Sequence, residues 1–288
     1  SALEKIKLNP YYTCSDEIGF SFERADQIAS SMGYGADFDF RIMCGTEYVL
    51  RHNVQNGHTC IPYDKAISVA CELLGATEQR VCESCEKMIE QQRLISDNIG
   101  DKRFLFLPYQ YKAERYIADR IKVMLHSAPP TPLDIKRSIA AIERELNIKF
   151  GELQYKAIEA AVEKGVLILT GGPGTGKTTT LNAIIRLMEN AGLTIALAAP
   201  TGRAAKRMTE VTGYESKTIH RLLEVEWDES HRPYFSRNER NTLDCHVLIV
   251  DEMSMVDSVM FESLLRAVPF GCRLVLVGDS NQLPSVGA

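Results

Sequence analysis

The stretch Gly171-Gly172-Pro173-Gly174-Thr175-Gly176-Lys177-Thr178 fits the pattern G-x-x-x-x-G-K-[ST], which is typical of a phosphate-binding loop. Its glycines allow the backbone to wrap around phosphates, so that successive N–H groups point at the anionic oxygens. Lys177 is expected to reach the β- and γ-phosphates, and the Thr178 hydroxyl is expected to ligate Mg²⁺. Residues 172–178, together with Thr179, are therefore the predicted nucleotide contacts.

The residues on either side place this loop between a strand and a helix. Residues 166–170, Val-Leu-Ile-Leu-Thr, are short, apolar and β-branched, which is typical of a buried strand in a parallel sheet. Residues 179–190 carry apolar side chains at helical spacing and end before Gly192. The order strand, loop, helix predicts an α/β fold, a P-loop NTPase domain with a parallel sheet.

Three further apolar runs, at residues 194–200, 246–250 and 272–277, predict more buried strands of the same sheet. The second of these runs ends in Asp251 and Glu252. Asp251 is expected to hold Mg²⁺, and Glu252 is placed to activate an attacking water as a general base. Gln282 follows the last run, and its amide can both donate and accept a hydrogen bond to sense a γ-phosphate. Because these strand ends meet at one edge, the predicted catalytic residues are Lys177, Asp251, Glu252 and Gln282.

The segment that follows residues 194–200 is rich in donors and positive charge. Thr201 and Gly202 can direct a hydroxyl and a backbone N–H at a phosphate, and Arg203 adds charge. For Arg203, Lys206 and Arg207 the alternative is an ordinary solvated helix face. Open α/β sheets bind ligands beyond the carboxyl ends of their strands, which favours the ligand interpretation.

The chain before residue 127 is expected to be mainly helical, in two parts. Around Ile18-Gly19-Phe20, two short helices flank an apolar–Gly–apolar turn, as in a helix–hairpin–helix that aims backbone N–H groups at a DNA phosphate. Ser21 stands where that motif usually has a second glycine, so a plain helical turn is an equal alternative. Residues 39–126 carry helical stretches and two β-like runs around a turn at 98–101. This part resembles a winged helix, with a scaffold or a DNA-guiding role equally open.

Three prolines within residues 127–132 disfavour helix and predict an exposed linker. A helix is expected at residues 133–146, and the P-loop domain is expected to begin near Phe150. The predicted domains are a helix–hairpin–helix region at 1–36, a winged-helix-like domain at 37–126, a linker with its connecting helix at 127–149, and the P-loop domain at 150–288.

The bulk properties of the chain are those of an ordinary globular protein. A length of 288 residues suggests about two domains. The net charge of −5 argues against a basic, non-specific DNA coat and leaves a local basic groove open. No apolar run of about 18 residues and no signal peptide pattern are present, so we expect no membrane association and a cytoplasmic location.

Eight cysteines are scattered along the chain, and reduced thiols are expected. The lone pair Cys82-Glu83-Ser84-Cys85 lacks a second pair at matching spacing, which favours ordinary helix residues over a metal or redox role.

Five segments together resemble a known family: GGPGTGKT, APTGRAAKRM, TIHRLL, VLIVDE and VGDSNQLPSVGA. This set is similar to superfamily-one DNA helicases, and most similar to the RecD-like family (exodeoxyribonuclease V alpha subunits). Residues 8–11, 18–20 and 25–26 also resemble segments of the long RecD-type helicases. The resemblance implies ATP and Mg²⁺ as cofactors and 5′-to-3′ translocation on single-stranded DNA, with a 5′-tailed duplex as substrate. It also implies that residues 150–288 form the first RecA-like motor domain.

The resemblance implies roles for individual residues as well. Gln154 matches a glutamine that reads adenine, and a carboxamide can pair with adenine N6 and N7. Pro200, Thr201, Gly202 and Arg203 match a segment that contacts single-stranded DNA. Thr218 and His220 match a second such segment, although Thr218 could equally cap a helix while His220 simply packs. Gln282 matches a residue that couples nucleotide state to DNA.

Other features leave alternatives open. Residues 224–241 are polar with interleaved aromatics, and a surface insertion is slightly favoured over a hairpin near DNA. The sequence ends at Ala288, directly after the last motif, so we expect a fragment without the second motor domain that unwinds no DNA by itself. Ser1-Ala2 is interpreted as an expression scar. A monomer acting alone is favoured over a nuclease-complex subunit, and a P-loop ATPase or DNA-binding adaptor without unwinding activity is the alternative function.

Overall fold

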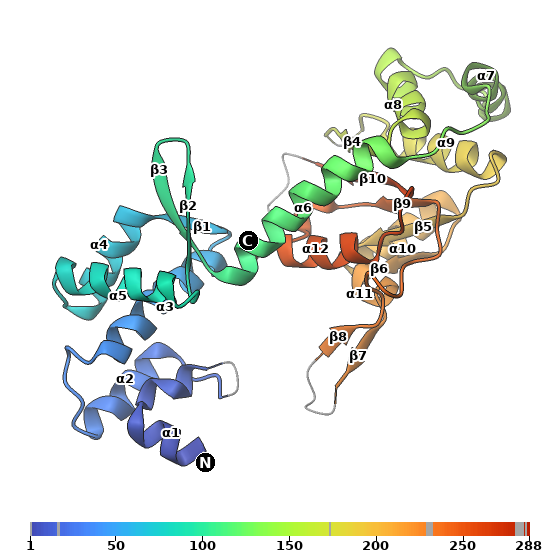
Figure 1. Ribbon diagram of the computed structural model, residues 1–288. Coiled ribbons are helices and arrows are strands. Elements are labelled where there is room, and N and C mark those ends of the chain that lie inside the picture. The colour runs from blue at the N-terminus through green and yellow to red at the C-terminus, as the bar shows by residue number, and fades with distance from the viewer. Residues whose placement is uncertain (1, 16–17, 173, 229–232, 280–284, 286) are drawn as a thin grey trace. The chain divides into compact units, whose positions relative to one another are not determined.

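The computed structural model describes residues 2–15, 18–172, 174–228, 233–279, 285 and 287–288 (Figure 1). It divides into two compact units, residues 1–112 with 286–288, and residues 113–285. The division falls within the long helix α6 (Pro108–Ser127), whereas the sequence places a domain boundary at the end of that helix. Each unit has its own core and is described by itself.

The first unit begins with three short helical elements, α1 (Ala2–Leu8), η1 (Pro10–Cys14) and α2 (Phe22–Ser31). Ile18, Gly19 and Phe20 connect η1 to α2, and Gly19 has a φ of +74° that a side chain would strain. Ser21 is the N-cap of α2, because its hydroxyl accepts a hydrogen bond from the Arg24 N–H at 3.4 Å. The residue that departs from the usual glycine therefore starts the second helix.

The rest of the first unit follows the order helix, strand, two helices, hairpin. The elements are α3 (Asp39–Gln55), β1 (Cys60–Pro62), α4 (Tyr63–Leu74), α5 (Glu78–Glu90), β2 (Ile95–Ile99) and β3 (Lys102–Phe106). The three strands form an antiparallel sheet in the order β1-β3-β2. The hairpin expected around residues 98–101 is confirmed. Cys82 and Cys85 both lie on α5, where burial raises the pKa of the Cys85 thiol to about 12.

A carboxylate on α2 joins that helix to η1 and α3. Asp26 accepts a hydrogen bond from the Tyr11 hydroxyl at 2.5 Å and from Arg41 Nε at 2.8 Å, while Arg41 Nη2 reaches its second oxygen at 3.1 Å. Burial opposes ionisation of Asp26, but the hydrogen bonds from Arg41 and Tyr11 prevail and lower its pKa. The two-pronged contact with Arg41 therefore fastens α2 to α3.

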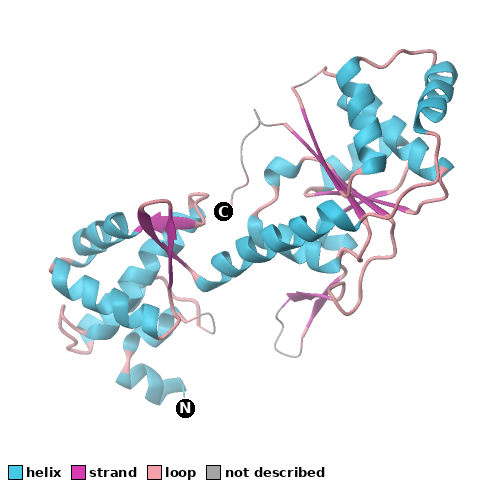
Figure 2. Ribbon diagram, turned by 45° about the horizontal axis from the view of Figure 1, so that its top comes forward, coloured by secondary structure: helices cyan, strands magenta, loops and turns pink. Residues whose placement is uncertain are grey.

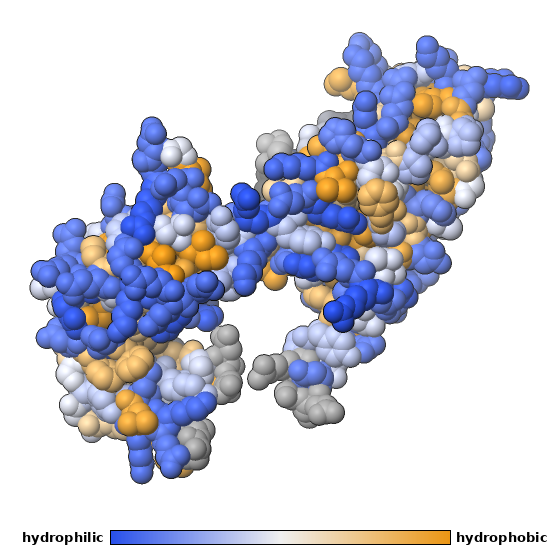
Figure 3. Space-filling view, in the orientation of Figure 1, coloured by the Kyte–Doolittle hydropathy of each residue, from blue (hydrophilic) through white to orange (hydrophobic). Residues whose placement is uncertain are grey.

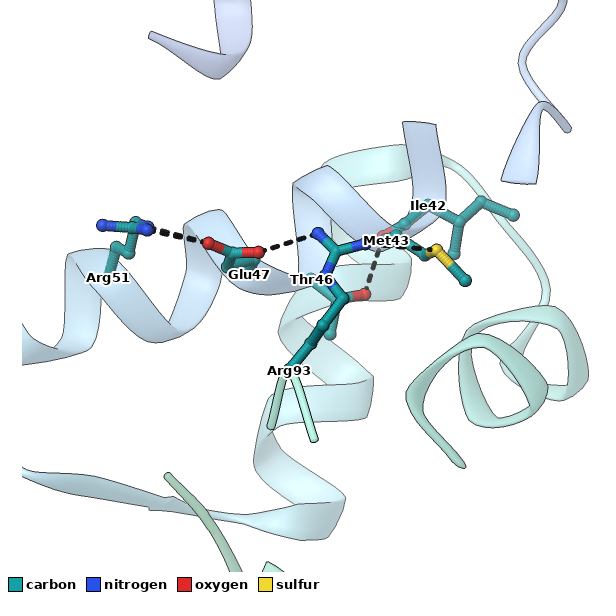
Figure 4. A network of polar contacts seen from close by, with 6 residues as sticks. All are labelled: Ile42, Met43, Thr46, Glu47, Arg51 and Arg93. Carbon is teal, nitrogen blue, oxygen red and sulfur yellow. Dashed lines mark hydrogen bonds and ion pairs between the residues drawn. The ribbon is translucent and has the colours of Figure 1, made fainter. Parts of the chain in front are cut away.

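A second polar network lies along α3 (Figure 4). The Glu47 carboxylate accepts hydrogen bonds from Arg51 on the same helix at 2.9 Å and from Arg93 at 3.0 Å. Arg93 follows α5, and its other nitrogen lies 3.6 Å from the Met43 sulfur. One acidic side chain thus links α3 to the end of α5.

The second unit is a three-layer α/β/α domain (Figures 1 and 2). Its parallel sheet has five strands in the order β4-β10-β9-β5-β6: β4 (Val166–Thr170), β5 (Ile195–Ala199), β6 (Ser216–Thr218), β9 (Val247–Val250) and β10 (Arg273–Gly278). Its helical elements are the rest of α6 with α7 (Ile135–Leu146), α8 (Glu152–Glu163), α9 (Lys177–Asn190), α10 (Gly202–Thr212), α11 (Ile219–Leu222), η2 (Met253–Met255) and α12 (Ser258–Ala267). A hairpin of β7 (Val225–Trp227) and β8 (Pro233–Phe235) completes the unit.

Alternation along the central strands builds the two faces of this sheet. Val247 and Ile249 pack with α7, α8, α9 and α10, whereas Leu248 and Val250 pack with α6, α11 and α12. Each face therefore has its own apolar layer, which explains why β9 is buried at every position. This result confirms the predicted α/β class and its parallel sheet.

The prediction that residues 166–170 form a buried strand is only partly right. They form a parallel strand, but β4 is the edge of the sheet and Ile168 is 67% exposed. An apolar run can be read equally as a central strand or as an edge strand, because the order of strands depends on non-local pairing. The fifth strand, β6, was not predicted, since its three residues carry too little pattern.

The proline-rich linker is held to the sheet. Arg273, which is 2% exposed, donates to the backbone carbonyl of Val162 at 3.0 Å, to that of Pro129 and to the Thr131 hydroxyl at 2.7 Å. All three partners are neutral oxygens, and burial lowers the pKa of this guanidinium. The linker backbone therefore packs beside the start of β10, while Pro129, Pro130 and Pro132 remain exposed.

The visible face of both units is mainly hydrophilic, with smaller apolar patches (Figure 3). On β7, the Trp227 side chain is 66% exposed. No described helix is long and apolar enough to cross a membrane.

Candidate functional site

The phosphate-binding loop connects β4 to α9 at the carboxyl edge of the parallel sheet (Figure 1). Gly174 and Gly176 have φ angles of +77° and +83°, which the loop needs to turn back on itself. α9 begins at Lys177, so its first turn carries the unpaired N–H groups and partial positive charge that favour an anion. The predicted order strand, loop, helix is confirmed.

The polar side chains of the loop turn inward. The Lys177 ammonium donates to the backbone carbonyl of Gly171 and to that of Gly172, the latter at 3.2 Å. The Thr175 hydroxyl donates to the carbonyl of Gly172 at 2.9 Å. Space is tight here, since a Cβ on Gly171 would lie 2.7 Å from the Thr175 hydroxyl oxygen. The Lys177 ammonium is thus held within the loop, where it can exchange these carbonyls for a phosphate group.

The acidic residues after β9 lie at the same edge. The Asp251 N–H donates to the carbonyl of Ala198 at 2.9 Å, which extends the pairing of β9 with β5 to the strand end. Glu252 has a φ of +53°, a left-handed conformation that costs a residue with a side chain about 1–2 kcal/mol. The Asp251 carboxylate accepts the Glu252 N–H at 2.9 Å and supports this turn. Such strain, held in place by a neighbour, is common at functional sites.

A cavity of about 170 Å³ brings these elements together. Lys177 and Thr178 of α9 line it, and so do Asp251 and Glu252. The register of the parallel strands brings these residues to the same edge of the sheet. Thr170 at the end of β4 pairs with Gly278 of β10, and Leu276 of β10 pairs with Val250 of β9. The cavity thus joins the predicted phosphate and magnesium ligands to the predicted general base.

Two further cavity residues were not predicted as part of the site. Asp279 follows β10 and is 5% exposed, and Arg207 reaches the cavity from α10. The position of Asp279 directly after an apolar strand was a usable signal. The sequence favours a ligand role for Arg207 over a solvated helix face, but only the packing of α10 places it in this cavity.

The donor set of the cavity suits a magnesium-bound nucleotide. Mg²⁺ prefers oxygen ligands, which the Thr178 hydroxyl and the Asp251 carboxylate provide. Lys177 supplies the positive charge for phosphates, and the neighbouring glycines allow the backbone to approach them closely. The residues present therefore fit the group that the loop pattern implies.

Gln154 lies beside the loop, on α8. Its carbonyl oxygen accepts the Gly151 N–H at 2.9 Å, and its amide nitrogen donates to the Gly176 carbonyl at 3.4 Å. A Cβ on Gly176 would lie 2.3 Å from that nitrogen. The amide is thus held next to the turn into α9 and keeps one donor and one acceptor lone pair for a base.

The segments expected to contact DNA follow β5 and β6 at the same carboxyl edge. Thr201 caps α10, because its hydroxyl accepts the Ala204 N–H at 3.2 Å, and Arg203 is exposed on the first turn. Thr218 caps α11 through the Arg221 N–H at 3.2 Å. His220 is exposed and its ring meets Phe235 edge-on at 6.0 Å. Both threonines therefore have a structural role, as the capping alternative for Thr218 proposed.

The remaining predicted site residues lie on or beside the elements already described. Pro200 lies between β5 and the Thr201 cap, Gly202 is the first residue of α10, and Thr179 lies in the first turn of α9. Residues 225–227 and 233–235 pair as the antiparallel strands β7 and β8, which carry Trp227 and Tyr234. Pro173 and Gln282 lie outside the described residues.

A glycine-rich phosphate loop that faces a strand ending in two acidic residues defines a P-loop nucleotide-binding domain. Comparison with known families agrees: a family model described as "AAA domain" matches residues 154–288, and one described as "ATP-dependent RecD2 DNA helicase HHH domain" matches residues 1–60. The chain belongs to the RecD-like family of superfamily-one helicases.

Individual relatives support this assignment. The chain is 32% identical over its whole length to the ATP-dependent RecD2 DNA helicase of Deinococcus radiodurans and spans 40% of that protein. It is 37% identical, over 64% of its length, to the RecBCD enzyme subunit RecD of Mycolicibacterium smegmatis and spans 36% of it. The ATP-dependent DNA helicase dda of Enterobacteria phage T4 is 36% identical over 45% of the chain, which spans 30% of that helicase.

Proposed function

We propose that residues 150–288 form the first RecA-like motor domain of an ATP-dependent DNA helicase that moves 5′ to 3′ on single-stranded DNA. The observation that carries this proposal is the cavity that joins Lys177 and Thr178 to Asp251 and Glu252. The chain spans less than half the length of the relatives it matches, so translocation and unwinding are proposed for the full-length protein.

The chemistry assigned to the cavity is hydrolysis of ATP. Bound Mg²⁺ would neutralise charge on the phosphates, with Thr178 and Asp251 as its protein ligands. Lys177 holds the β- and γ-phosphates in place once its ammonium leaves the loop carbonyls. The Glu252 carboxylate accepts a proton from the attacking water as the water oxygen bonds to the γ-phosphorus, and the bond from the γ-phosphorus to the β–γ bridging oxygen breaks, which releases ADP and phosphate. Gln154 reads the adenine, and Gln282 senses the γ-phosphate.

The DNA track is proposed along the carboxyl edge of the sheet beyond β5 and β6. Pro200, Thr201, Gly202 and Arg203 would contact one stretch of the strand, and Thr218 and His220 the next. Because the Thr201 and Thr218 hydroxyls already cap helices, their backbone N–H groups and the exposed Arg203 are the donors we assign to phosphates. A DNA substrate makes the cytoplasm the proposed place of action.

A nuclease-complex subunit is the second candidate, and the similarity to RecBCD enzyme subunits named RecD favours it. The match of residues 1–60 to the helix–hairpin–helix domain of RecD2 helicases supports the first candidate, a helicase that acts alone as a monomer. The two candidates share the ATP site and differ in partners.

The test uses the full-length protein with ATP, Mg²⁺ and duplexes that carry either a 5′ or a 3′ single-stranded tail. We expect unwinding of the 5′-tailed duplex, and loss of both unwinding and DNA-stimulated ATP hydrolysis in Lys177→Ala. Lys156→Ala, an exposed substitution on α8, is the matched control and should leave both activities intact. Hydrolysis that survives Lys177→Ala would refute the assigned site, and preference for the 3′ tail would refute the polarity.

A further inference from the structure

The ATP cavity has a second cation besides Lys177. Arg207 lines the cavity from α10, and Lys177 lines it from the start of α9. Three carboxylates, those of Asp251, Glu252 and Asp279, line the same space. Among the described residues, the exposed Arg207 side chain forms no hydrogen bond and no ion pair, whereas Arg266 of the same unit pairs with Glu262. Its guanidinium is therefore available to a ligand.

The backbone of α10 is fixed where it presents Arg207. The neighbouring Met208 is 1% exposed and belongs to the core under the sheet. Near the end of α10, the Val211 carbonyl accepts a hydrogen bond from the Asn182 amide at 3.0 Å, and Asn182 lies on α9. The helix that carries Arg207 is thus fastened directly to the helix that carries Lys177 and Thr178.

The chemistry of the cavity indicates which ligand group Arg207 meets. Guanidinium is always charged and its planar fork matches a phosphate, to which it can donate two hydrogen bonds. The loop and Lys177 reach the cavity from the α9 side and Arg207 reaches it from α10, while the proposed general base Glu252 lines the same space. If the loop holds the β-phosphate of a nucleotide, the γ-phosphate lies in this space. ATP has a γ-phosphate and ADP does not, so only ATP can reach Arg207.

We propose that Arg207 contacts the γ-phosphate of ATP and so makes α10 sensitive to whether ATP or ADP is bound. The inference rests on the proposed function, because it requires the cavity to hold ATP. Arg207 lies four residues after Arg203, about 6 Å along the same helix. One rigid helix therefore links the γ-phosphate to the segment proposed to contact DNA, in addition to the link proposed through Gln282.

The test compares nucleotide affinities of wild type, Arg207→Ala and Arg207→Lys, with Mg²⁺ and either ADP or a non-hydrolysable ATP analogue. Loss of a charge-assisted contact to one phosphate predicts about tenfold weaker binding of the ATP analogue by Arg207→Ala. Binding of ADP should change less than twofold, and Arg207→Lys should recover part of the loss. Lys206→Ala is the matched control, because Lys206 is the exposed neighbour that does not line the cavity.

A second readout addresses the link to DNA. In wild type we expect the affinity for a single-stranded oligothymidine to differ between the ATP analogue and ADP, and in Arg207→Ala this difference should shrink toward none. Equal loss of ADP and analogue affinity, or unchanged analogue affinity, in an Arg207→Ala protein with wild-type thermal unfolding would overturn the inference while the proposed function stands. If wild type binds neither nucleotide, both fail.

Discussion

Substitution of Gln154 tests base recognition apart from phosphate binding. In the structure its amide accepts the Gly151 N–H at 2.9 Å and donates to the Gly176 carbonyl at 3.4 Å. The second bond is long and therefore weak, and a carboxamide has two donors and two acceptor sites in all. Gln154 can consequently pair with the N6 and N7 atoms of adenine at little cost in existing contacts.

The size of the effect follows from that geometry. A two-bond pair between a carboxamide and adenine contributes about 1–3 kcal/mol of discrimination against another base. A central value of about 2 kcal/mol corresponds to roughly thirtyfold in the dissociation constant. Gln154→Ala removes both bonds and should abolish the preference. Gln154→Glu keeps the acceptor for Gly151 and loses the donor, so it should retain only part of the preference.

The assay is equilibrium titration of the protein with ATP, GTP and inorganic tripolyphosphate in the presence of Mg²⁺. We expect the ratio of GTP to ATP dissociation constants to fall from about thirty in wild type toward one in Gln154→Ala. Tripolyphosphate affinity should not change, because it depends on the loop and Lys177. Lys156→Ala, on the same helix, controls for general disturbance of α8. An unchanged ratio in Gln154→Ala, with normal thermal unfolding, would refute the assignment of adenine reading to Gln154.

Two further predictions concern stability. Asp26→Asn should lower the free energy of unfolding by about 2 kcal/mol at pH 7, because it removes the charge that Arg41 meets at 2.8 Å. Since the fold lowers the Asp26 pKa, this contribution is present above the ordinary pKa of 3.8 and is lost as the pH falls through the folded value. Urea unfolding between pH 7 and pH 2 checks it, and a difference that does not shrink as the pH falls below 3.8 would contradict the reasoning. Gly165→Ala should cost about 3 kcal/mol in the same measurement, because its Cβ would lie 1.7 Å from the Met124 carbonyl oxygen, whereas Gly202→Ala, which meets nothing within 4 Å, should cost little.

Features that depend on a short stretch of the chain could be predicted, because the residue types and spacings that determine them lie within that stretch. The loop at residues 171–178 requires a fixed spacing of glycines, one lysine and one threonine, and helical spacing marked the helix behind it. The β2–β3 hairpin and the strands that end at Asp251 and Asp279 likewise carry their pattern within a few residues. These signals sufficed for the fold class and for most of the cavity.

Features that depend on contacts between distant segments could not be predicted in this way. The order of strands made β4 an edge rather than a buried strand, and the three-residue β6 had no pattern of its own. Thr218 fitted both a DNA contact and a helix cap, and the geometry of α11 shows the cap. Asp26 and Arg41 are 15 residues apart, and no pattern in either segment predicts that they pair.

The sequence by itself therefore determined that this protein has a phosphate-binding loop and an acidic strand end. Only the tertiary structure decided that these lie in one cavity together with Asp279 and Arg207. The physical reason is the sheet order, in which β10 and β9 lie between β4 and β5 and bring residues far apart in the chain to one edge. Strand pairing of this kind is set by packing on both faces of the sheet, which no local spacing of residues records.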